Sequence, residues 1–174
     1  AVGTRLFAAT VERFGEDRRV YVRERSTQGA WNVVPGRTAQ GSVAAGVASG
    51  APVRLVAGRR DPVVATLVSS GPTRGLFFSS YNSTVSPGSW ATPYAIDEGG
   101  TSAFDLVTRG DAAFLAYIAD GRLRLRRVDF RSTFAIPRDV EGPEGLVLNA
   151  DPACVASQPE LAATLDRVWL AWDE

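Results

Sequence analysis

Acidic side chains are the only groups in this chain that could perform general acid–base chemistry in number. The 174 residues include 19 Arg and 19 acidic residues, a single Cys, and no Lys, His or Met. Without His and Lys there is no Ser-His-Asp site, no Cys-His site and no Lys base, and one Cys cannot build a structural zinc site. We therefore predict neither a metal ion nor a cofactor.

A pair of carboxylates, as in glycoside hydrolysis, is the catalytic arrangement that remains. Candidate acids lie at the ends of predicted strands, at Asp105, Asp111, Asp120 and Asp173-Glu174. Most of them fit turns better, as in the Asp120-Gly121 dipeptide, which is typical of a two-residue hairpin loop. The sequence therefore favours a protein that is not an enzyme, with glycoside hydrolysis as the catalytic alternative.

Tryptophan and tyrosine side chains could form a binding site, because a flat apolar ring can stack on a sugar. The candidate ligand-binding residues are Trp31 and Trp90, together with Arg23 and Tyr81. The structural alternative is that the two Trp side chains lock the turns in which they lie. We predict a glycan as the ligand if these residues form a site.

Two further features of the sequence are more typical of a structural role than of a binding or reactive site. Arg122, Arg124 and Arg126 alternate along one face of a predicted strand and could bind an anionic glycan or phosphate. Acidic residues nearby in sequence favour a solvated outer strand instead. Cys154 lies in an apolar stretch and is predicted to be a small buried core residue.

Short apolar runs between turn residues dominate the chain and predict an all-β fold. The clearest strands are expected at residues 5–11, 19–25, 53–57, 63–68, 76–81, 103–107, 113–118, 123–130 and 167–172. Residues 158–165 are the best helical candidate and could equally form a turn. No apolar run approaches the ~20 residues of a membrane span, so we predict none.

Similar strands recur at intervals of about 50–60 residues, the size of one four-stranded propeller blade. Blades are expected at about residues 1–38, 39–98, 99–142 and 143–174, as part of a ring. In the second blade, residues 42–49 and 53–57 are expected as the first two strands. Residues 63–68 then form an excess strand, which favours the alternative fold, a two-sheet β-sandwich.

A Ser-Thr turn followed by an aromatic residue closes three of the segments, at residues 26–31, 83–90 and 132–134. The first copy, Ser26-Thr27-Gln28-Gly29-Ala30-Trp31, resembles the Asp-box of bacterial β-propellers of the sialidase-like or lectin-like kind, although the acidic residue of that motif is missing. The resemblance implies that such turns link the outer strands of each blade. Propellers with these turns include lectins, hydrolases and scaffolds.

The predicted function is accordingly non-catalytic, lectin-like binding of carbohydrate by a secreted or cell-surface protein. The alternative is an interaction scaffold or an assembly subunit that a partner chain completes. Zero net charge argues against nucleic acid as a partner. The strand at residues 167–172 has no predicted neighbour after it, so we expect self-association or attachment to the remainder of a larger polypeptide.

Overall fold

The computed structural model describes residues 5–58, 60–69, 75–84, 88–129, 146–149, 151 and 153–174. These residues form strands and loops without a helix, so the prediction of an all-β fold is confirmed. Within the same residues, no helix with the length and apolar character of a membrane span occurs. The third Ser-Thr turn, at residues 132–134, lies outside the described part of the chain.

The described residues form four antiparallel sheets that follow one another along the chain. Sheet 1 contains β1 (Phe7–Phe14), β2 (Asp17–Arg25), β3 (Trp31–Val33) and β4 (Ala44–Ala45). Sheet 2 contains β5 (Val53–Ala57), β6 (Pro62–Val68), β7 (Gly75–Asn82), β8 (Ser89–Trp90) and β9 (Tyr94–Asp97). Sheet 3 contains β10 (Thr101–Arg109), β11 (Ala112–Ala119), β12 (Arg122–Asp129) and β13 (Leu146–Val147). Sheet 4 is the hairpin of β14 (Ser157–Ala163) and β15 (Val168–Asp173).

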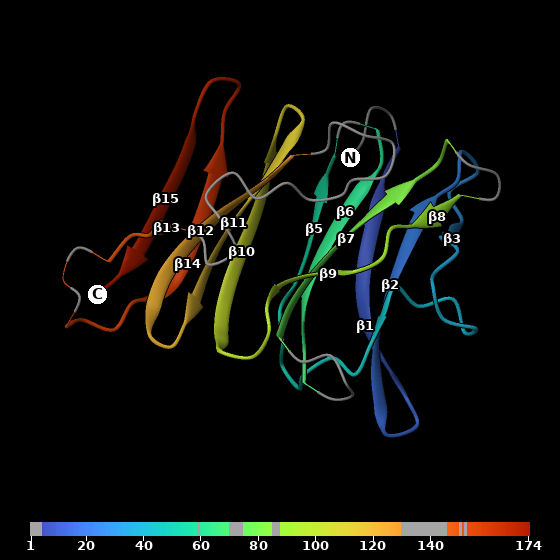
Figure 1. The fold of residues 1–174 in the computed structure, drawn as a ribbon. Coiled ribbons are helices and arrows are strands. Elements are labelled where there is room, and N and C mark those ends of the chain that lie inside the picture. Colours follow the sequence, from blue (N-terminus) through green and yellow to red (C-terminus); the bar gives the residue numbers. More distant parts are fainter. Residues whose placement is uncertain are drawn as a thin grey trace.

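The sheets pack face to face in the order of the sequence (Figure 1). Three core clusters lie between successive sheets and include Val22 with Val64, Phe78 with Leu115, and Ile118 with Leu161. Strand β6 is buried along its whole length because sheet 2 is covered on both faces. Strand β15 alternates between half-buried and exposed positions, since sheet 4 is covered on one face only.

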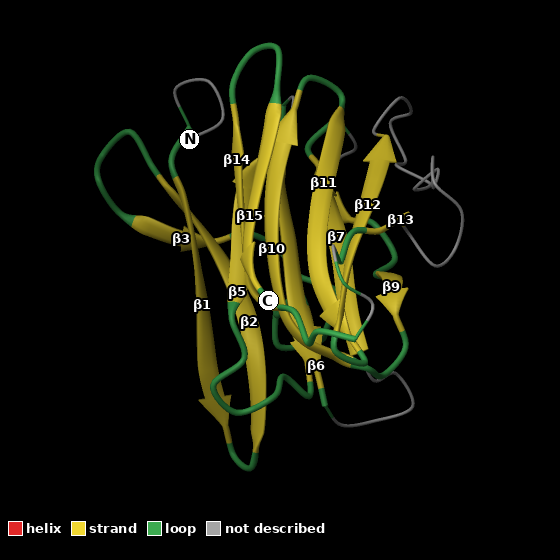
Figure 2. Ribbon diagram, turned by 90° about the vertical axis from the view of Figure 1, so that its left-hand side faces the viewer, coloured by secondary structure: helices red, strands yellow, loops and turns green. Residues whose placement is uncertain are grey.

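The first strands of successive sheets lie along a common edge of this stack. Strand β1 contacts β5, β5 contacts β10, and β10 contacts β14. Figure 2, turned by 90°, shows β10 and β14 next to one another. The described strands thus form a succession of layers and not the two sheets of a β-sandwich, while the propeller and its blade boundaries stay predictions.

The strand order of sheet 2 differs from the predicted one. Strand β5 pairs with β6 and β6 pairs with β7, so residues 53–57 are the first strand and residues 63–68 lie in the second. The described sheet has five strands, one more than a four-stranded blade, because β8 and β9 both pair with β7. Residues 42–49, expected as the first strand, instead contribute β4, which pairs with β2 of sheet 1. The amide of Val43 donates to the Val20 carbonyl at 2.8 Å, and both side chains are buried in the core between sheets 1 and 2.

Two predictions near the C-terminus are wrong. Residues 158–165 are largely strand β14 and neither helix nor turn, because Pro159 and Leu161 are buried while Glu160 between them is exposed, which is the period of a strand. Cys154 is exposed and not buried. It lies in a turn, where its amide donates to the Asp151 carbonyl at 3.1 Å, and Ala156 takes the core position instead.

Candidate functional site

Two of the Ser-Thr turns lie in neighbouring sheets, and each connects two strands of its own sheet. In the first, the amide of Ser26 donates to the Ala30 carbonyl at 2.7 Å, and Gly29 adopts a φ of +88°, which closes the hairpin between β2 and β3. In the second, the Thr84 amide donates to the Asn82 side chain at 2.9 Å at the end of β7. Each turn leads to a short strand that carries a tryptophan.

The structure brings two of the four predicted ligand-binding residues together. Tyr81 and Trp90 pack against each other with ring centroids 5.3 Å apart, and Trp90 is 5% exposed. Trp31 is 45% exposed and lies opposite Arg25 in the sheet, on the face that also carries Arg23. Val20 and Val22 of β2 point into the core between sheets 1 and 2, so the residues that alternate with them point away from sheet 2. Arg23 and Trp31 are therefore separated from Tyr81, which belongs to sheet 2.

Arg23 has its own partners on that outer face. Its guanidinium donates to Glu12 at 2.5 Å and to the Thr10 hydroxyl at 2.8 Å. These contacts lower the pKa of the Glu12 carboxyl below its ordinary value, with the hydrogen bond from Arg23 as the main cause. Arg23 is therefore engaged in an ion pair within sheet 1.

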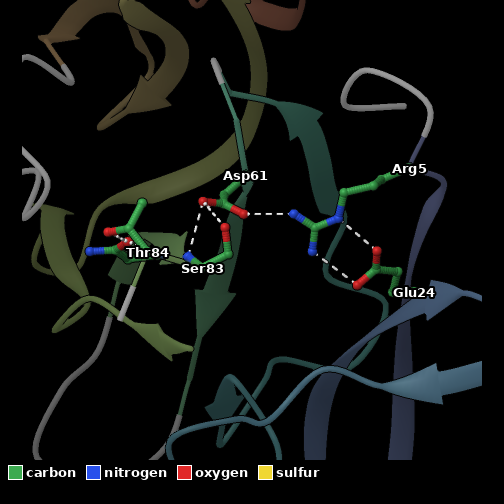
Figure 3. Close-up of polar contacts among 6 residues, drawn as sticks. Arg5, Glu24, Asp61, Ser83 and Thr84 are labelled. Carbon is green, nitrogen blue, oxygen red and sulfur yellow. Dashed lines mark hydrogen bonds and ion pairs between the residues drawn. The ribbon is translucent and has the colours of Figure 1, made fainter. Parts of the chain in front are cut away.

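A cluster that was not predicted joins sheets 1 and 2 (Figure 3). Its charged residues Asp61, Arg5 and Glu24 act on the nearby Tyr81 hydroxyl. Arg5 donates to both carboxylate oxygens of Glu24, from Nε at 2.6 Å and from Nη2 at 2.9 Å. Its Nη1 donates to Oδ1 of Asp61 at 3.0 Å. The other Asp61 oxygen accepts the amide and the hydroxyl of Ser83, at 3.0 and 2.9 Å. Asp61 is 9% exposed, whereas the Arg5 and Glu24 side chains are 33% and 32% exposed, so this cluster is a half-buried, charge-assisted network.

The network shifts the protonation equilibria around it. The hydrogen bond from Arg5 lowers the pKa of the Glu24 carboxyl, and the same contact raises the pKa of Arg5. Burial raises the pKa of the Tyr81 hydroxyl, and the charge of Asp61 raises it further. At neutral pH Glu24 is therefore an ionised acceptor, and Tyr81 is a neutral phenol that can donate a hydrogen bond.

A cleft of about 260 Å³ opens next to this network. Its lining consists of Glu24, Ser26, Asn32, Val33, Val34, Pro35 and Tyr81. The polar members are a carboxylate, a hydroxyl, an amide and a phenol, and the others give an apolar wall. The cleft is slightly below the ~300 Å³ at which pockets for drug-sized ligands begin, so it suits one small ring. Among the described residues, no group of His, Cys, Asp and Glu could hold a metal ion.

Asp105 and Asp120, two of the carboxylates considered as catalytic candidates, have structural roles. Asp105 on β10 accepts the Arg54 guanidinium of β5 at 2.6 Å and the Leu161 amide of β14 at 2.7 Å, so a single side chain links sheets 2, 3 and 4. Asp120 has a φ of +52° in the β11–β12 turn, in agreement with the predicted hairpin. Asp61 was not among the candidate acids, because its partner Arg5 is distant in the sequence.

The predicted arginine stripe is solvated only in part, since Arg122 is exposed and Arg124 is half-buried, whereas Arg126 is buried. Arg126 is 3% exposed, and its guanidinium donates to the Ile96 carbonyl and, at 3.1 Å, to the Tyr94 hydroxyl. The stripe of β12 thus faces sheet 2, because Val128 on the same face belongs to the core between sheets 2 and 3. Arg126 is therefore not available for an anionic ligand.

Comparison of the chain with protein-family models, with curated proteins and with solved structures finds no match. The resemblance to bacterial propellers therefore stays a prediction, and the geometry of the site is the basis of the functional interpretation.

Proposed function

We propose that this protein is a non-catalytic binding module that holds a neutral saccharide ring in the cleft beside Tyr81. The observation that carries the proposal is the cleft itself, in which four kinds of hydrogen-bonding group surround an apolar wall. A sugar ring presents the complementary surface, with hydroxyls around its rim and C–H groups on its faces.

The polar groups of the cleft are held in place before a ligand arrives. Glu24 is fixed by two hydrogen bonds from Arg5, and Arg5 is in turn fixed by Asp61. The Tyr81 ring rests on buried Trp90. Such preorganisation favours affinity, because few side-chain rotamers are lost on binding.

The ionisation of the site supports binding over hydrolysis. A glycosidase needs one carboxylic acid whose pKa is raised, so that it can protonate the leaving oxygen. The pKa of Glu24 is lowered, and the Tyr81 hydroxyl is held in its neutral form. These groups suit hydrogen bonding to sugar hydroxyls.

The layered fold is in keeping with the same proposal. Propellers consist of successive four-stranded antiparallel sheets around an axis, and here the first strands of successive sheets share one edge. In a lectin-like propeller, shallow sites of this kind would recur where neighbouring blades meet.

A glycan array followed by calorimetry tests the proposal. We expect binding of a neutral saccharide, and we expect Asn32→Ala and Tyr81→Ala to weaken it by about tenfold or more, as for the loss of a well-placed hydrogen bond or ring contact. Trp31→Ala is the matched control, because Trp31 is exposed on the far face of sheet 1, and it should leave affinity unchanged. Folded protein that binds no glycan, or a loss confined to Trp31→Ala, would contradict the proposal.

A specific observation favours a second candidate, an assembly subunit. Trp169 on β15 is 55% exposed on the outer face of sheet 4. Among the described strands, β15 pairs with β14 alone. A second copy of the chain is the partner that we propose for this surface, and the Discussion gives its test.

A further inference from the structure

Two arginines face each other beside the tip of the β1–β2 hairpin. Arg13 and Arg18 are directly opposite in the strand register. A two-residue turn sets this register, with Gly15 at a φ of +63°. Residues directly opposite in a sheet have Cβ atoms about 5 Å apart, and like charges in such a pair are destabilising.

Neither guanidinium is neutralised by a carboxylate in the part of the chain that the structure describes. Arg13 donates from Nε to the Gly15 carbonyl at 2.8 Å. The Arg18 side chain makes no hydrogen bond or ion pair with a described residue, although the Arg18 carbonyl accepts the Val47 amide at 3.1 Å. The neighbouring Asp17 is engaged elsewhere, since its two oxygens accept Arg19 at 2.9 Å and the Gly46 amide at 2.8 Å.

The two arginines line a cleft of about 430 Å³. The β1–β2 hairpin that carries them projects below the other strands in Figure 1. The lining consists of Arg13, Glu16, Asp17, Arg18, Gly46, Val47, Ser49 and Ser69. Arg13 and Arg18 lie on the face of sheet 1 that is directed toward sheet 2, as do the core residues Val20 and Val22. Hydroxyls of Ser49 and Ser69 add hydrogen-bonding groups to the same cleft.

We propose that this cleft binds a tetrahedral oxyanion, a phosphate or a sulfate, between the guanidinium groups of Arg13 and Arg18. Guanidinium groups match such oxyanions with paired N–H donors, and an anion between the two arginines replaces their repulsion with attraction. The Ser49 hydroxyl can donate to a remaining oxygen, and the Ser69 hydroxyl can do so in exchange for its long, 3.4 Å hydrogen bond to the Gly46 carbonyl. The inference does not depend on the saccharide proposal, because the two clefts share no residue.

Thermal unfolding and calorimetry with phosphate, sulfate and chloride at constant ionic strength test the inference. We expect saturable stabilisation by phosphate and sulfate, and at least about tenfold weaker binding in Arg13→Gln and Arg18→Gln. Arg25→Gln is the matched control, because Arg25 is an exposed arginine of the same strand on the opposite face. It should retain the response of the unmodified protein.

The behaviour in chloride gives a second readout. Removal of one of two opposed charges should leave the stability of Arg18→Gln equal to or above that of the unmodified protein when no oxyanion is present. An equal response of Arg18→Gln and the unmodified protein to phosphate would show only the general stabilisation by excluded salts and would overturn the proposal. A phosphorylated monosaccharide separates the sources of the anion: tighter binding than inorganic phosphate assigns the site to a phosphate ester, and equal binding assigns it to the free ion.

Discussion

Arg5 holds two acidic residues that come from different sheets. Glu24 lies on β2, and Asp61 directly precedes β6. Because Asp61 is 9% exposed, its carboxylate depends on Arg5 and Ser83 for compensation of its charge. The contact that Arg5 makes between sheets 1 and 2 is therefore electrostatic.

We expect Arg5→Gln to lower the free energy of unfolding by about 1–3 kcal/mol, because a buried carboxylate loses its cation. Urea unfolding at neutral pH measures the change. Arg23→Gln is the control, since the ion pair of Arg23 with Glu12 lies on the exposed face of sheet 1, and its loss should be within about 1 kcal/mol. Equal effects of the two substitutions would contradict the special role of Arg5.

The acid sensitivity of the fold should depend on Glu24. Its pKa is lower in the folded protein than in the unfolded chain, chiefly through Arg5, so its contribution to stability is present above the ordinary glutamate pKa of about 4.3 and is lost as the pH falls toward the lower folded value. Unfolding followed from neutral pH to about pH 3 should show a shallower loss in Glu24→Gln than in the unmodified protein. Parallel curves would mean that Glu24 contributes nothing to acid unfolding.

At the scale of elements, the terminal hairpin is attached to the stack by side chains as well as by its apolar face. Leu161, Val168 and Leu170 belong to the cluster between sheets 3 and 4. The amide of Leu161 donates to Asp105 at 2.7 Å, in place of a further strand. Asp105 therefore caps one edge of β14.

Asp105→Ala should increase hydrogen exchange throughout β14 and β15, because the Leu161 amide loses its acceptor and the hairpin opens more often. Exchange in β6 and β7, which lie in the buried centre of the stack, should stay the same. Asp166→Ala is a suitable comparison, since Asp166 is exposed in the turn of the same hairpin. Unchanged protection of Leu161 in Asp105→Ala would show that apolar packing alone holds the hairpin.

At the scale of the whole molecule, the outer sheets 1 and 4 differ from the inner sheets 2 and 3. Sheets 2 and 3 are covered on both faces, while the outer face of sheet 4 exposes Trp169 beside Ala162 and Ala171. Among the described strands, β1 pairs with β2 alone and β15 with β14 alone, so β1 and β15 do not pair with each other. Exposed aromatic faces and free strand edges favour association.

We expect the chain to form oligomers at micromolar concentration, as measured by light scattering after size-exclusion chromatography. Trp169→Asp should shift the population to monomers, because it places a charge in the centre of the exposed face. Leu165→Asp is the control, as Leu165 is fully exposed in the β14–β15 turn away from that face. A stable monomer with a cooperative melt would exclude the assembly interpretation.

Local patterns in the sequence were sufficient for the fold class and for the turns. Alternating residues, as in Val20-Tyr21-Val22-Arg23, and turn residues such as Asp120-Gly121 act within a few positions of one another, so they can be read from the chain alone. Tyr81 was identified as a candidate because of its residue type. Glu24 and Asp61 were not, since Arg5 and Asp61 are 56 residues apart and no local pattern joins them.

Tertiary packing decided what the same local motif does in different places. Trp31 and Trp90 follow similar Ser-Thr turns, yet Trp31 is 45% exposed and Trp90 is 5% exposed. Trp31 lies on the outer face of the terminal sheet, whereas Trp90 lies between sheets 1 and 2. The sequence by itself determined an all-β chain with hairpin turns at both tryptophans. Only the stacking of the sheets decided which tryptophan is buried, because burial depends on the neighbouring sheet and not on the strand that carries the residue.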